Sequence, residues 1–224
     1  MGRDNPGMGV KQQVGLHKNT GDRGEIMKNK SNLIKYGFLS LIYDRFFTFV
    51  FSSGRKKSFS MIKIRKDDKV LLVGVGTGLD LPLLPAGARV TGVDISPVML
   101  LKAEKRKTSG TRLMVMNAEK LKFKSGSFDI VILNFILTVV ENPPSAMREA
   151  LRVLKKGGRI LVWDKFSRDK KPGFVRRMFN VVTSFMGTDI TRNFEEISRG
   201  MKFSVLRDEP GMFGGNFRTI LIKK

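Results

Sequence analysis

From residue 69 onward, short runs of aliphatic and β-branched residues alternate with stretches that have helical periodicity. Five runs predict strands, and four intervening stretches predict helices. The predicted strands are 69–74, 89–94, 112–117, 128–134 and 159–164, and the predicted helices are 79–84, 97–107, 119–122 and 143–155. This alternation is typical of the α/β class, in which a doubly wound, mostly parallel sheet has helices on both faces.

The last third of the chain predicts the end of the same sheet. Residues 174–186 predict one more helix, and runs at 201–208 and 216–222 flank a glycine-rich turn at 211–215. Strands joined by a short turn pair antiparallel. We therefore expect a mostly parallel sheet of seven strands that ends in a C-terminal antiparallel hairpin.

By composition the chain divides into three parts. Residues 1–26 are rich in glycine and polar residues and lack periodicity, so we expect a disordered leader. The character changes at Met27, which we interpret as the native initiator. Residues 27–66 predict an aromatic-rich helical segment that serves as a lid or a membrane contact, and residues 67–224 predict the domain that contains the sheet.

The helical segment contains a long apolar stretch at 31–53 whose polar residues form one narrow stripe. Its apolar surface is too wide for a single contact with a core. Two interpretations stay open: the helix is buried between the core and a lid, or its outer face lies in a membrane interface with residues 55–57 as a basic anchor. In the second interpretation the inserted side chains are Phe46, Phe47, Phe49 and Phe51.

The composition excludes several kinds of chemistry. The chain has no Cys and one His, so cysteine nucleophiles, disulfides and zinc sites lack their residues, and we expect no metal. With 42 Lys and Arg against 20 Asp and Glu, the formal net charge is +22. Such a charge attracts phosphate groups, so the expected partners are an anionic membrane surface or a nucleic acid.

Small and polar residues stand where the first three predicted strands end. The first strand leads into Gly74, Gly76 and Gly78, a turn that lets the backbone approach a ligand closely. The second ends at Asp94, whose carboxylate can accept hydrogen bonds from both hydroxyls of a ribose. The third ends at Asn117, whose amide can read an adenine edge. Since parallel strands end at one edge of a sheet, these residues predict a common site.

The motifs around these residues resemble the class I S-adenosylmethionine-dependent methyltransferases. The similar stretches are VLLVGVGTG, VTGVDISPVMLLKAEKR, NAEKLKF, GSFDIVILNF and ALRVLKKGGRILVWDKF. The resemblance implies a Rossmann-like fold, methyl transfer, and S-adenosyl-L-methionine as the cofactor. It also implies the cofactor contacts: the methionine part near Gly74, Gly76, Thr77 and Gly78, the ribose at Asp94, the adenine at Ile95, Asn117 and Ala118, and the sulfonium near Asn134.

The chain departs from the family pattern at two positions. The family usually has an acidic residue where this chain has Leu72, and often Asp where it has Asn117. The first departure removes a charged partner of the cofactor's amino group, for which we expect Asp80 to substitute.

Within this family, YDRFFTFVFSSGRKKSF at 43–59 and LDLPLLP at 79–85 resemble the bacterial phospholipid N-methyltransferases, which methylate phosphatidylethanolamine. The resemblance implies a cytoplasmic enzyme that is peripheral on the inner face of the membrane, with a phospholipid or another lipophilic amine as substrate. It places Tyr43 over the cofactor at the substrate entrance.

Methyl transfer from a sulfonium needs alignment and desolvation more than a strong base. The amine still loses a proton, and Glu141 and Asp164 are candidates to receive it. The predicted catalytic residues are therefore Tyr43, Asn134, Glu141 and Asp164. Besides Tyr43, the predicted substrate-binding residues are cations that could hold a lipid phosphate: Arg55, Lys165 and Arg192.

Three alternatives stay open. The net charge of +22 is also compatible with an rRNA methyltransferase, and Asn142-Pro143-Pro144 is similar to a motif of adenine N6 enzymes. However, residue 145 is Ser and cannot stack on a flipped base, so Asn142 reads better as a helix N-cap. A small-molecule or quinone methyltransferase would use the aromatic helix to line its pocket. A membrane-surface module without catalysis is favoured by Leu72 alone.

Overall fold

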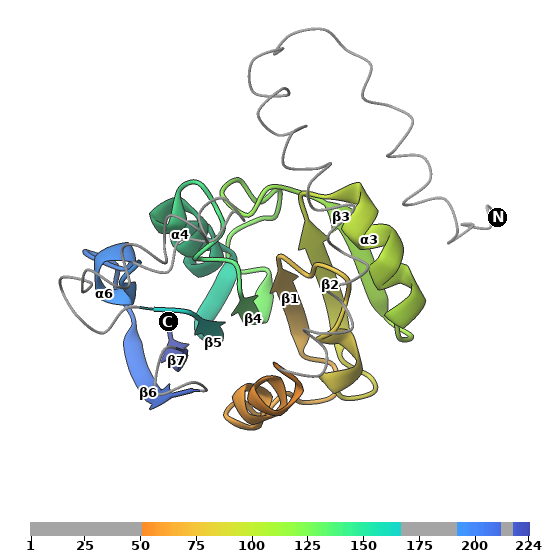
Figure 1. Ribbon diagram of the computed structural model, residues 1–224, viewed down its shortest axis with the longest axis horizontal. Coiled ribbons are helices and arrows are strands. Elements are labelled where there is room, and N and C mark those ends of the chain that lie inside the picture. Colours follow the sequence, from red (N-terminus) through yellow and green to blue (C-terminus); the bar gives the residue numbers. More distant parts are fainter. Residues whose placement is uncertain (1–50, 167–191, 212–216) are drawn as a thin grey trace, which may run out of the picture.

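A computed structural model describes residues 51–166, 192–211 and 217–224 (Figure 1). It contains one seven-stranded sheet in the order β3-β2-β1-β4-β5-β7-β6. The strands are β1 (Lys69–Val73), β2 (Arg89–Asp94), β3 (Thr111–Val115), β4 (Phe128–Asn134), β5 (Leu154–Asp164), β6 (Ser204–Pro210) and β7 (Arg218–Lys223). β1 to β5 pair in parallel, whereas β7 pairs antiparallel with both β5 and β6. The expected fold class is confirmed, including the C-terminal hairpin.

Helices cover both faces of this sheet. Residues 51–60 are helical, and the other helices are η1 (Leu81–Leu83), α3 (Pro97–Ala103), η2 (Glu104–Arg106), α4 (Pro143–Val153) and α6 (Phe194–Ile197). In Figure 1, α3 lies beside β2 and β3, and α4 lies beside α6. α3 and α4 each begin with a proline after a polar cap: the Ser96 hydroxyl accepts from Met99 N, and Asn142 Oδ1 accepts from Ser145 N. Asn142 is therefore the N-cap that the sequence predicts.

The residues of β1 alternate between two apolar layers. Leu71 and Val73 lie in the layer that contains α4 and α6. Val70 and Leu72 lie in the opposite layer, with α3 and the end of the helix at residues 51–60. A strand that is buried on both faces reads as a continuous apolar run, which is why β1 is so clear in the sequence.

Several predicted boundaries are wrong. The stretch 119–122 is a turn and not a helix, because Asn117 Oδ1 and the Glu149 carboxylate take the backbone N–H groups of Glu119 and Leu121. β5 begins at Leu154, five residues before its predicted start. The described helix spans residues 51–60, so it ends at Ser60 and not at the predicted residue 53. Residues 1–50 and the predicted helix at 174–186 lie outside the described residues.

The prediction that Phe51 inserts into a membrane is wrong. Phe51 is buried in an aromatic cluster that we define as Phe51, Phe135, Trp163 and Phe217. The ring centroid of Phe51 lies 5.5 Å from that of Phe135 and 5.4 Å from that of Phe217. The helix at residues 51–60 is thereby attached to the carboxyl ends of β4 and β5. Among the described helices, none has the length and apolar content to cross a membrane.

Candidate functional site

The loop after β1 brings backbone to the carboxyl edge of the sheet. Gly74, Gly76 and Gly78 have φ values of 71°, 55° and 83°, a region that side chains disfavour. A Cβ on Gly78 would lie 3.0 Å from both Cα and Cβ of Ala103 in α3. Among the described residues, a Cβ on Gly76 would meet nothing nearer than a carbonyl oxygen at 4.0 Å. Gly78 therefore permits close packing, whereas Gly76 keeps a space open.

Asp94, at the end of β2, connects this loop to α3. Its Oδ2 accepts from Gly76 N at 2.8 Å and its Oδ1 accepts from Ser96 N at 2.9 Å. Burial raises the pKa of Asp94, and the backbone N–H groups of Ser96, Gly76 and Ile95 oppose the rise. A carboxylate has about four lone-pair sites, so these N–H groups still leave Asp94 able to accept from a hydroxyl of a bound molecule.

The residues predicted to contact adenine surround the same edge. Ile95 is exposed directly after Asp94, and Ala118 is buried after β3. The side chain of Asn117 is exposed, but its Oδ1 accepts from Glu119 N at 2.8 Å, so its NH2 group remains the donor. Thr77 is buried, and its carbonyl accepts from Arg106 Nη1 at 2.8 Å.

Sequence reasoning did not foresee a buried ion pair beside the glycine loop. Arg55 donates to Asp80 Oδ1, and Asn134 Nδ2 donates to Asp80 Oδ2 at 2.8 Å. The Arg55 guanidinium carbon also lies 5.6 Å from the Trp163 ring and 5.9 Å from the Phe135 ring. Asp80 was predicted to replace the acidic residue that is missing at Leu72, and Arg55 was predicted to bind a phosphate. In the structure the two residues are bonded to each other.

Asn134 ends β4 in an environment that a ligand would complete. The residue is 6% exposed, and among the described residues its Oδ1 accepts no hydrogen bond. The next residue, Phe135, has a φ of 54°, which is rare outside glycine and turns its ring into the aromatic cluster. Buried acceptors are nearly always bonded, so an orphan at a strand end points to a bound group.

Asp164 lies completely buried at the end of β5. It accepts from the Thr138 hydroxyl at 2.5 Å, from Thr138 N at 3.2 Å and from Lys165 N at 2.8 Å. Burial raises the pKa of Asp164, against these hydrogen bonds and the charge of Lys165. The geometry favours a role in holding the loop after β4 over the predicted role as proton acceptor, which stays untested.

Of the other predicted residues, Arg192, Lys165 and Glu141 lie around this loop. Arg192 Nη1 donates to the carbonyls of Leu137 and Val140, both at 2.7 Å. Burial lowers the pKa of Lys165, opposed by Asp164, and its Nζ lies 5.8 Å from the Phe217 ring. Glu141 is exposed just before α4, and Tyr43 lies outside the described residues.

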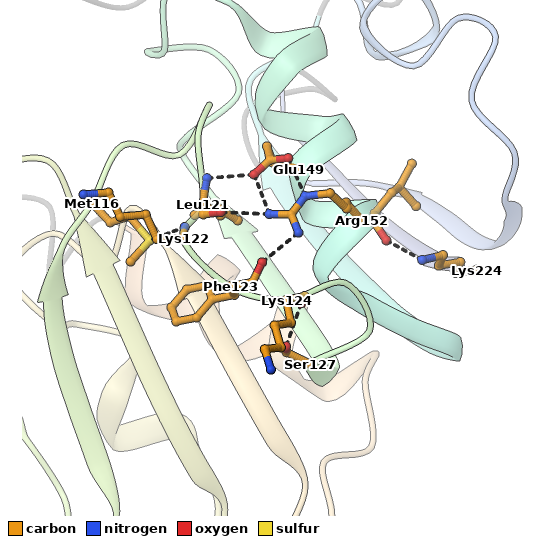
Figure 2. Close-up of polar contacts among 10 residues, drawn as sticks. Met116, Leu121, Lys122, Phe123, Lys124, Ser127, Glu149, Arg152 and Lys224 are labelled. Atoms are coloured by element: carbon orange, nitrogen blue, oxygen red, sulfur yellow. Dashed lines mark hydrogen bonds and ion pairs between the residues drawn. The ribbon is translucent and has the colours of Figure 1, made fainter.

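Figure 2 shows how α4 holds the segment that follows β3. Glu149 Oε2 accepts from Leu121 N at 2.7 Å. Arg152 donates to both Glu149 oxygens and to the carbonyls of Leu121 and Phe123, all at 2.7–2.8 Å. At the end of α4, Lys224 Nζ donates to the carbonyls of Leu151 and Leu154. The segment that carries Asn117 and Ala118 is thus tied to a helix on the sheet.

We expect Arg152→Met to loosen this segment while leaving the sheet intact. Methionine keeps the aliphatic volume but leaves two carbonyls without their donor, at about 1–3 kcal/mol. Hydrogen exchange should accelerate at residues 117–123, with a two- to tenfold loss of cofactor affinity measured by calorimetry. Arg148→Met, which removes an exposed arginine on the same helix, is the control. Equal exchange in both variants would contradict the prediction.

The residues present fit S-adenosylmethionine. The open side of Gly76, the spare lone pairs of Asp94 and the exposed Ile95 offer a backbone cradle, a diol acceptor and an apolar surface at one edge. The orphan Asn134 Oδ1 lies at the same edge, since the neighbouring pair Val73 and Leu133 is in register. Within the described residues, no cluster of His, Cys, Asp or Glu is placed to hold a metal ion.

Comparison with known proteins agrees with this arrangement. The family profile described as "Methyltransferase domain" matches residues 71–162. A phosphatidylethanolamine N-methyltransferase from Cereibacter sphaeroides is 34% identical over 189 residues, which cover 82% of this chain and 93% of that protein. A demethylmenaquinone methyltransferase from Tropheryma whipplei is 36% identical over 120 residues, which cover 52% of this chain and 49% of that protein.

Among solved structures, an S-adenosylmethionine-dependent methyltransferase from Thermotoga maritima superposes with a TM-score of 0.64 at 22% identity, covering 85% of this chain and 98% of that chain. This similarity supports the fold. The Cereibacter sphaeroides relative matches most of its own length and most of this chain, and it therefore shows the family. The protein is an enzyme whose cofactor is S-adenosylmethionine. The chain belongs to the class I S-adenosylmethionine-dependent methyltransferases, and among them it is similar to the bacterial phosphatidylethanolamine N-methyltransferases.

Proposed function

We propose that the protein methylates the amine of a phospholipid head group while it is bound peripherally to the inner, anionic face of the cytoplasmic membrane. The observation that carries the proposal is the extent of the similarity. The phosphatidylethanolamine enzyme matches over 82% of this chain, whereas the quinone enzyme matches over 52%. Similarity restricted to the cofactor-binding half says little about a substrate, but similarity over most of the chain includes the segments that select one.

The reaction needs a desolvated, aligned amine beside the cofactor. S-adenosylmethionine supplies a methyl group that is activated by the sulfonium charge. We assign the methionine part of the cofactor to Gly74, Gly76, Thr77 and Gly78, the ribose to Asp94, and the adenine to Ile95, Asn117 and Ala118. The aromatic cluster and the Arg55–Asp80 pair lie next to Asn134 and exclude water from this side of the edge.

For the lipid phosphate we propose Lys165 first. It is half-buried at the end of β5, where an anion would restore the charge interactions that burial removes. The guanidinium groups of Arg55 and Arg192 already bond to Asp80 and to the carbonyls of Leu137 and Val140. Those bonds fix where each guanidinium lies, so only its remaining N–H groups could turn to a phosphate.

The membrane contact has support on α3. Val98 and Leu101, 43% and 51% exposed, are three residues apart and therefore share one face of the helix. Lys102 and Lys105 follow in the next turn. Each cation held near an anionic bilayer contributes about 1 kcal/mol, so a small part of the +22 net charge is sufficient for recruitment.

Transfer of a labelled methyl group from S-adenosylmethionine identifies the methyl acceptor. The protein is incubated with vesicles of phosphatidylethanolamine and phosphatidylglycerol, with a demethylmenaquinone and with ribosomal RNA, and we expect label in phosphatidylethanolamine. Vesicle pelleting should persist partly at high salt, because apolar insertion is not screened. Label in RNA or quinone and none in phospholipid would overturn the substrate and leave the enzyme class standing.

A matched pair of variants tests the membrane face. Replacing Val98 and Leu101 with Ser should lower pelleting at high salt several-fold. Replacing Val205 and Leu206 with Ser is the control, because these residues of β6 are 53% and 48% exposed on the strand at the opposite edge of the sheet. Equal losses in both variants would show that α3 is not the contact.

A further inference from the structure

Asp80 lies between a cation and an amide. Arg55 donates to one carboxylate oxygen, and Asn134 Nδ2 donates to the other. In this ion pair Asp80 offers acceptors only, so Asn134 must present its NH2 group to it. The orientation of the Asn134 amide is therefore fixed by its neighbour, and its oxygen is directed away from Asp80.

The Asn134 oxygen is the orphan acceptor of the site. Asn134 is 6% exposed, and no described residue donates to its Oδ1. Asn134 follows Leu133, which pairs with Val73 of β1, so it lies level with Gly74 where the glycine loop begins. A buried oxygen without a partner at this edge calls for a donor on a bound molecule.

We propose that the Arg55–Asp80 pair positions the Asn134 amide so that its Oδ1 accepts a hydrogen bond from an N–H of the methyl acceptor. The inference rests on the proposed function, methyl transfer to an amine, and adds how the site recognises the nucleophile. Asn134 is then a catalytic residue, whereas Asp80 and Arg55 are positioning residues that act through it.

The chemistry explains why an acceptor is useful there. The lone pair of the amine nitrogen forms the new N–C bond while the C–S bond breaks and its electron pair stays on sulfur. Positive charge thus moves from sulfur to nitrogen, and one proton then leaves nitrogen for solvent. An N–H bound to Oδ1 becomes more acidic as that charge develops, so the hydrogen bond strengthens toward the transition state. A carbon nucleophile has no such N–H.

The number of N–H bonds provides an internal control. A primary amine has two N–H groups and its monomethyl product has one, but a dimethylamine nucleophile has none. Oδ1 can therefore assist the first and second transfers and not the third. We expect Asn134→Ala to lower kcat by about ten- to hundredfold with phosphatidylethanolamine and its monomethyl derivative. With the dimethyl derivative the change should stay within about threefold.

Two further variants test the positioning role. In Asp80→Asn the new amide can donate to Asn134, which turns Oδ1 away from the nucleophile, so the first two transfers should fall as in Asn134→Ala. Adding Asn134→Asp to Asp80→Asn restores an outward acceptor and should recover most of the loss, which a merely structural role would not do. Asp129→Asn is the control. Asp129 lies at the amino end of β4, where it accepts from Lys155, and the variant should leave the relative rates with the three lipids unchanged.

Melting temperature and the affinity for S-adenosylhomocysteine are measured for each variant. If Oδ1 binds the methyl acceptor, the affinity for S-adenosylhomocysteine should change by less than about threefold in Asn134→Ala. An affinity loss that equals the loss of kcat would assign Oδ1 to the cofactor and overturn the proposal. Equal losses with all three lipids, or no rescue by the double variant, would also overturn it and leave the proposed function standing. If the wild-type protein methylated none of the three lipids, both the role of Asn134 and the proposed function would be overturned.

Discussion

Replacing Asp94 with alanine is expected to weaken the binding of S-adenosylhomocysteine by about 1.5–3 kcal/mol, the range for hydrogen bonds to a charged group. This corresponds to a roughly 10- to 150-fold increase in Kd. The carboxylate accepts from Gly76 N and Ser96 N, so its loss also removes the link between the glycine loop and the start of α3. Calorimetry measures the effect, and Asp129→Ala, a carboxylate outside the site, is the control.

The same carboxylate gives the binding a pH dependence. Burial raises the pKa of Asp94 above its ordinary value of 3.8. The diol needs the ionised form as acceptor, so affinity should be full above the raised pKa and decline as the pH falls through it. In Asp94→Asn this decline should be absent. An alanine variant that binds as tightly as the wild type would refute the assignment of Asp94.

Alanine at Gly78 and alanine at Gly76 are expected to fail in different ways. Both positions carry a positive φ, which costs a side chain about 1–2 kcal/mol. At Gly78 the new Cβ also meets the backbone of Ala103 at 3.0 Å, and overpacking adds about 1–3 kcal/mol. We therefore expect Gly78→Ala to lower the free energy of unfolding by about 2–5 kcal/mol, measured in urea.

Gly76→Ala should lower the free energy of unfolding only by the smaller cost of its positive φ, because in the space beside its Cβ no atom of the described residues lies nearer than 4.0 Å. If the cofactor occupies that space, its affinity should fall at least tenfold in this variant. The two variants are thus matched, since they make the same change two residues apart. A Gly76→Ala protein with unchanged affinity would show that the cofactor does not pass over this residue.

The sequence predicted the central strands well because they are buried on both faces. The runs at 89–94 and 128–134 match β2 and β4 at both ends. Boundaries failed where tertiary contacts decide the local structure. Residues 119–122 have helical character, yet the Glu149 carboxylate of α4 takes Leu121 N and keeps them in a turn. Such a contact spans 28 positions and leaves no periodic signal.

The site divides in the same way. The glycine loop and Asp94 follow their strands directly, so local pattern and strand order place them together. Arg192 and Asp164 also reach this region, but they bond to the loop after β4, which only the folded chain reveals. The ion pair between Arg55 and Asp80 joins residues 25 positions apart, and both had been assigned to ligands instead of to each other.

The position of β7 has a consequence for how the chain assembles. β7 follows β6 in the sequence but lies between β5 and β6, and within the described sheet β6 pairs with β7 alone. During synthesis from the N-terminus, β1 to β5 can associate while the backbone N–H and C=O groups along one edge of β5 are still unpaired. β6 is synthesised before β7, the strand with which it pairs, so it cannot join the sheet until β7 has formed. We therefore expect the pairing of β7 with β5 to be a late folding step, and until it occurs the unpaired backbone edge of β5 is open to pairing with other chains.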